Sequence, residues 1–225
     1  MHRLLLALAT TAALLAGTAF AQQQVRVTGV QIDELVELPP EMRLGVFLDL
    51  GDGARELGSV RMVAGTFDLD SSGMVPEERD LRALVSGSFP LAFMIGNEFV
   101  VDREGARFAT AWLQPYHDQN DSGAYEELFD EWFFRAPPEL TDPFGYFNLV
   151  YVDRDVVLRT TPAEFALRTG WNLVVARVEG GALAYDVTTS VSDVVVYSYG
   201  TNRTFENLDR PEDAPADEPE ADGTD

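Results

Sequence analysis

Apolar and polar residues alternate along most of this chain, in short segments separated by glycine or proline. Alternation with a period of two is typical of β-strands that bury one face. Thr169-Gly170 and Gly180-Gly181 are predicted to be hairpin turns. The pattern predicts strands at 25–30, 43–48, 60–69, 89–95, 108–113, 146–152, 156–159, 164–168, 172–178, 183–187 and 194–199.

Two segments have the apolar spacing of a helix instead. The first, 76–85, begins with proline and acidic residues, and the second, 124–134, ends before Pro137-Pro138. Short strands with glycine turns outnumber these helical segments. The chain is therefore predicted to be mainly β, an antiparallel β-sandwich of the Ig or prealbumin type with one or two short helices.

The two ends of the chain differ from its middle. Residues 1–21 combine Arg3, an apolar run and the small-residue pattern Ala19-Phe20-Ala21, as in a secretory signal peptide. That run is too short for a stable membrane span, so we expect a secreted or periplasmic protein. Residues 208–225 are rich in proline and acidic side chains and are expected to be a disordered tail.

The expected β-rich domain covers residues 22–207. The proline-rich segment 136–143 either divides it in two or forms a long loop within one domain. The 225 residues contain no cysteine, so packing must hold the domain together without disulfides.

Charge and residue usage exclude several function classes. The formal net charge is −22, which disfavours nucleic acid and anionic membranes as partners. All 16 basic residues are arginine, so Schiff-base chemistry on lysine is excluded. His117 is the one histidine after the signal segment, and without cysteine a zinc site rich in histidine or cysteine cannot form.

The segment 118–130 carries the clearest candidate site. Oxygen-bearing side chains at alternate positions, followed by glycine, match the start of a calcium loop, although position 12 is Phe129 and not glutamate. A tight turn is the alternative explanation. The predicted calcium ligands are Asp118, Asn120, Ser122, Glu126 and Asp130.

Two motifs resemble known bacterial families. The run 116–126 resembles the calcium loops of bacterial surface β-sandwich modules, such as the B-type repeats of staphylococcal Sdr adhesins. The run 165–174, with Gly170-Trp171-Asn172, is similar to a hairpin of secreted bacterial β-sandwich domains, including uncharacterised proteins of Deinococcus-like bacteria. These resemblances imply calcium binding and a structural or adhesive role.

The sequence as a whole favours an exported, non-enzymatic β-sandwich protein. We expect it to have a structural or binding role toward a protein or another envelope component, with calcium as a stabilising ion. No residue is assigned a catalytic or cofactor-binding role, and the oligomeric state does not follow from the sequence. Two alternatives stay open. One is a hydrolase with a pair of buried carboxylates about 5 to 9 Å apart in a cleft. The other is a barrel that carries a small apolar ligand in a closed apolar cavity of about 300 Å³ or more.

Overall fold

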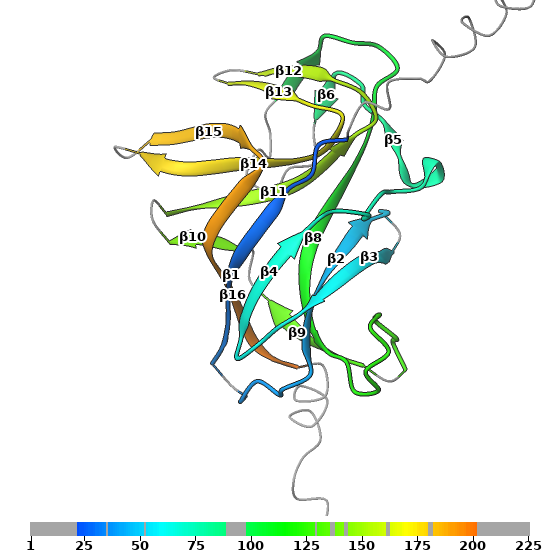
Figure 1. Ribbon diagram of the computed structural model, residues 1–225. Coiled ribbons are helices and arrows are strands. Elements are labelled where there is room, and N and C mark those ends of the chain that lie inside the picture. Colours follow the sequence, from blue (N-terminus) through cyan, green and yellow to red (C-terminus); the bar gives the residue numbers. More distant parts are fainter. Residues whose placement is uncertain are drawn as a thin grey trace, which may run out of the picture.

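The computed structural model describes residues 22–34, 36–51, 53–88, 98–128, 130–135, 138–141, 144–160, 163–179 and 182–201, which fold almost entirely into β-strands (Figure 1). The expected signal segment 1–21, the tail 208–225, the predicted strand 89–95 and the predicted turn Gly180-Gly181 lie outside these residues.

The described strands form two sheets. The twelve-stranded sheet contains β1 (Arg26–Asp33), β2 (Met42–Asp49), β3 (Ala54–Arg61), β4 (Thr66–Asp70), β5 (Arg82–Ala83), β8 (Arg107–His117), β9 (Glu131–Arg135), β10 (Glu139–Thr141), β11 (Phe144–Val152), β14 (Gly170–Glu179), β15 (Ala182–Thr188) and β16 (Ser190–Thr201). The four-stranded sheet contains β6 (Gly87–Ser88), β7 (Glu98–Val101), β12 (Val156–Thr160) and β13 (Glu164–Leu167). The ladders are antiparallel except for the parallel pair β1 and β16. The prediction of a mainly β, sandwich-like fold is confirmed.

Both predicted helices were wrong. Segment 76–85 forms only a 3-10 turn, η1 (Glu78–Asp80), because the carboxylate of Asp80 accepts the backbone N–H of Glu77 and pairs with Arg55. The chain then pairs with β8 as β5. In segment 124–134, the described residues 124–128 and 130 are irregular and are followed by β9, in which Phe133 is buried in the core. No helix in the described part of the chain is long and apolar enough to cross a membrane.

The large sheet curls around its own apolar face. The strands β3, β2, β8, β9, β16, β1 and β4 follow one another through hydrogen-bonded ladders. The two ends of this series, β3 and β4, are consecutive in the sequence and are joined by the turn at 62–65 (Figure 1). β9 and β10, on either side of residues 136–137, both pair with β16 in this sheet.

Strands β11 and β14 are buried on both faces. Leu149 and Leu173 point into the core of the curled sheet. Their neighbours Val150 and Val174 point the opposite way, into a second core beneath the small sheet. This explains why 171–176 is a continuous buried run and not an alternating one.

The Gly170-Trp171-Asn172 motif joins these strands to the start of the chain. Gly170 has a φ of +106°, and a Cβ atom there would lie 2.4 Å from the backbone oxygen of Gln23, so only glycine fits. The Trp171 ring is buried, and its N–H donates to the backbone oxygen of Met74 at 2.5 Å. The amide of Asn172 donates to the backbone oxygen of Arg168 at 2.8 Å and fixes the turn.

We expect Leu173→Ala to lower the free energy of unfolding by about 3 to 5 kcal/mol, because it leaves a cavity in the core of the curled sheet. Urea unfolding followed by tryptophan fluorescence measures this loss. Val178→Ala, in the exposed part of the same strand, is the matched control and should change stability by less than about 0.5 kcal/mol. Equal losses in the two variants would contradict the assignment of Leu173 to the core.

Candidate functional site

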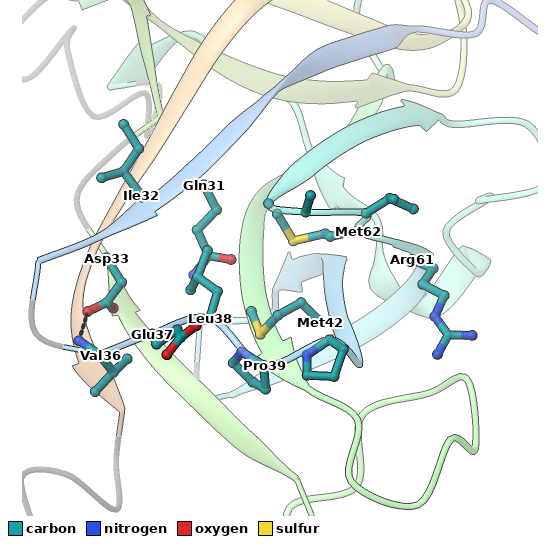
Figure 2. A pocket seen from close by; sticks show the side chains of 14 residues that line it. Gln31, Ile32, Asp33, Val36, Glu37, Leu38, Pro39, Met42, Arg61 and Met62 are labelled. Carbon is teal, nitrogen blue, oxygen red and sulfur yellow. Dashed lines mark hydrogen bonds between the residues drawn. The ribbon is translucent and has the colours of Figure 1, made fainter.

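A groove of about 800 Å³ opens at one end of the curled sheet (Figure 2). Its walls are the end of β1, residues 36–40 before β2, and the turn between β3 and β4. Met42 and Met62 line the groove with buried side chains, and the exposed Val63 also lines it.

Local sequence explains why this end stays open. Pro39-Pro40 lacks backbone N–H donors, so the connection before β2 cannot join a ladder at those positions. Val36 and Leu38 instead pack their side chains against the core. On the opposite wall, Gly65 has a φ of +75° and its backbone oxygen accepts the N–H of Gln31 at 2.8 Å.

A polar network that includes Gln31 and Asp33 adjoins the groove. The amide nitrogen of Gln31 donates to the Ser198 hydroxyl at 3.2 Å, and this hydroxyl donates to the carboxylate of Asp33 at 2.5 Å. Asp33 also accepts the backbone N–H groups of Gly200 and Val36, both at 2.9 Å. The amide oxygen of Gln31 is buried and has no hydrogen-bond partner in the described structure.

Sequence reasoning missed this groove, because the first strand was predicted to end at residue 30 and not at Asp33. A signal was present. Val27, Gly29 and Gln31 continue one alternating face, so Gln31 is a polar residue at an inward position. A polar side chain at a buried position needs a hydrogen-bond partner, so Gln31 indicated a polar site at this end of the sheet.

All five predicted calcium ligands lie in one loop, 118–130, between β8 and β9. Asp118 and Asp130 are each 1% exposed. The carboxylate of Asp118 accepts the backbone N–H groups of Ser122 and Gly123, both at 2.9 Å. Asp130 accepts those of Gln119 at 3.2 Å and Glu126 at 2.7 Å. Both carboxylates therefore hold the loop closed.

The other predicted ligands lie closer to the surface. The Asn120 amide donates to Glu126 at 2.9 Å, and Ser122 is exposed. An Nη atom of Arg43 lies 3.8 Å from the carboxylate of Asp118 and supplies positive charge. Among the described residues, no group of three or more His, Cys, Asp or Glu is arranged to hold a metal ion. Calcium binding by the loop stays a prediction.

Glu56, which sequence reasoning did not identify, anchors this loop to the sheet. One carboxylate oxygen accepts the Tyr116 hydroxyl at 3.0 Å, and the other accepts the backbone N–H of Tyr125 at 2.6 Å. Burial raises the pKa of Tyr116 above its usual value. The rings of Tyr116, Tyr125 and Phe47 meet edge to face, so these aromatic residues pack against one another beneath the loop.

Five described carboxyl groups have a pKa below the usual value. A general acid for hydrolysis needs a raised pKa, so these five groups do not suit that role. The backbone N–H of Thr169 and the Arg168 guanidinium, for example, hold the pKa of Asp155 below its usual value. The two ring nitrogens of His117 lie 3.8 Å from carboxylate oxygens of Glu41 and Glu131.

Comparisons of the chain with protein-family models, with curated proteins and with solved structures found no match. The resemblance of 116–126 to bacterial calcium loops therefore also stays a prediction.

We expect Asp118→Asn to lower the free energy of unfolding by about 2 kcal/mol, because an amide nitrogen cannot accept one of the two buried N–H groups that the carboxylate holds. Thermal melting by circular dichroism measures the effect. Asp121→Asn is the control within the same loop, since Asp121 is exposed and has a φ of +53°, which asparagine tolerates. Equal melting temperatures for wild type and Asp118→Asn would contradict this role.

The same melting experiment tests the ion. If the loop binds calcium, millimolar Ca²⁺ should raise the melting temperature of the wild type and not that of Asp118→Asn. An unchanged wild-type melting temperature would contradict calcium binding.

Asp155 should contribute stability that depends on pH. Its pKa is lower in the folded chain than in the unfolded chain, so the contribution is present above about pH 4 and is lost as the pH falls through the folded-state value. Asp155→Asn should therefore cost about 1 kcal/mol at pH 7, a figure discounted for the partial exposure of this side chain. The cost should shrink below pH 4.

Urea unfolding at pH 7 and pH 3 measures this difference. Glu104→Gln, at an exposed position in the turn before β8, is the control. A cost for Asp155→Asn that is the same at both pH values would contradict the prediction.

Proposed function

We propose that this protein is an exported, non-enzymatic binding protein that holds an uncharged, largely apolar small molecule in the groove at the end of the curled sheet. The groove carries the proposal. Its volume of about 800 Å³ lies within the range of roughly 300 to 1,000 Å³ that is usual for small-molecule sites.

The lining of the groove favours an apolar ligand. Met42 and Met62 supply flexible thioether side chains that adapt to the shape of a ligand. Val63 is 70% exposed and Ile32 is 43% exposed at the rim. A bound apolar molecule removes these side chains from water and gains about 25 cal/mol for each Å² of apolar surface that it buries.

The charges around the groove favour a ligand without negative charge. The whole chain has a net charge of −22, which repels anions at long range. Arg61 is the cation that lines the groove, and its guanidinium lies 4.0 Å from Asp121. A ligand carboxylate would therefore compete with an acidic side chain for that cation.

Binding of a small molecule corresponds to the ligand-carrier alternative and not to the protein or envelope partner expected first. The site is an open groove, whereas that alternative expected a closed cavity. The hydrolase alternative is less favoured. The buried carboxylates Asp118 and Asp130 hold backbone N–H groups of their own loop, and the groove contains an amide, Gln31, as its buried polar group.

We expect 1-methoxynaphthalene, an uncharged apolar probe, to bind the protein saturably, as measured by its fluorescence. Val63→Asp should weaken this binding roughly tenfold, because it replaces apolar rim surface with a charge. Val85→Asp is the matched control, since Val85 is 69% exposed against 70% for Val63 but does not line the groove. Its affinity should equal that of the wild type.

Two results would contradict the proposed function. One is the absence of saturable binding to the wild type by any uncharged apolar probe of this size. The other is an equal loss of affinity in Val63→Asp and Val85→Asp, since that would place the probe outside the groove.

A further inference from the structure

We propose that the amide oxygen of Gln31 selects ligands that carry an O–H or N–H donor, so the preferred occupant of the groove is an uncharged apolar molecule with a single hydroxyl or other uncharged donor group. This inference rests on the proposed function and names the ligand class. Gln31 is 4% exposed and lines the groove.

The hydrogen-bond network fixes which end of the amide faces the groove. The carboxylate of Asp33 can only accept hydrogen bonds, so the Ser198 hydroxyl donates its proton to it at 2.5 Å. The hydroxyl oxygen is then an acceptor, and the amide group of Gln31 must present its nitrogen, which donates at 3.2 Å. A flipped amide would place two acceptors against each other.

The amide oxygen is therefore left on the side of the groove. Figure 2 shows it pointing toward the space beside Met42 and Met62. It is the one buried acceptor atom without a partner among the described side chains, and the other unpartnered buried atoms are Nε donors of arginines 55, 82, 135 and 177. A buried acceptor without a donor is unfavourable, and a ligand hydroxyl satisfies it.

The side chain of Leu38 crosses the groove. Its Cδ1 atom is 3.5 Å from the position that a Cβ atom would take on Gly65, so it reaches from the wall formed by residues 36–40 to the opposite wall. Leu38 is partly buried and packs against the core. An apolar ligand replaces this contact with one of the same kind, and its donor then reaches the amide oxygen.

A pair of probes tests the selection. The probe 1-naphthol carries one hydroxyl donor, and 1-methoxynaphthalene is its methyl ether. Wild type should bind 1-naphthol about tenfold more tightly than the ether, as measured by fluorescence titration. Gln31→Met removes the amide oxygen but keeps the length of the side chain, so it should abolish this preference while the ether still binds.

Gln24→Met is the control, because Gln24 lies just before the opposite end of β1 and is exposed. It should keep the wild-type preference. The comparison of the two probes in wild type tests the inference even if Gln31→Met fails to fold.

The outcomes separate the two proposals. Equal affinity of wild type for both probes, or a preference that survives in a folded Gln31→Met, would overturn the selection by Gln31 and leave the proposed function standing. Saturable binding of neither probe would overturn both.

Discussion

The fold depends on burying both faces of strands β11 and β14. With no cysteine in the chain, apolar packing must supply the stability that disulfides provide in other domains. Side chains from one face of these two strands enter the core of the curled sheet, and those from the other face enter the core beneath the small sheet. Each of the two strands therefore contributes side chains to both cores.

Aspartate side chains that accept backbone N–H groups stabilise several loops. Asp118 and Asp130 close the long loop after β8, and Asp33 ties the end of β1 to β16. Hydrogen bonds from N–H groups to a carboxylate are stronger than neutral ones. The many carboxylates of this acidic chain can thus stabilise its loops. The same hydrogen bonds give the calcium-like motif at 118–123 a role in the structure of the loop itself.

The period-two pattern predicted the mainly β fold because alternation reports directly which face of a strand is buried. The pattern failed where contacts with distant parts of the chain decide the secondary structure. Trp132 has helical spacing with Tyr125, yet 131–135 is a strand because β8 and β16 offer it hydrogen-bond partners. The groove could not be predicted either, because it depends on which strand ends meet. Only Gln31 at an inward position pointed to it from the sequence.

Gln31 also shows how the groove relates to stability. A valine or leucine at this inward position would pack in the core without an unpaired acceptor. The amide oxygen of Gln31 instead lowers the free energy of unfolding by about 1 to 3 kcal/mol while it lacks a donor. That cost is a sizeable part of the 5 to 15 kcal/mol that typically stabilises a domain. A fold that depends on packing alone would not benefit from it. The cost is understandable if a ligand offsets it, because the same unpaired oxygen then becomes the source of preference for a donor-bearing molecule over an inert one.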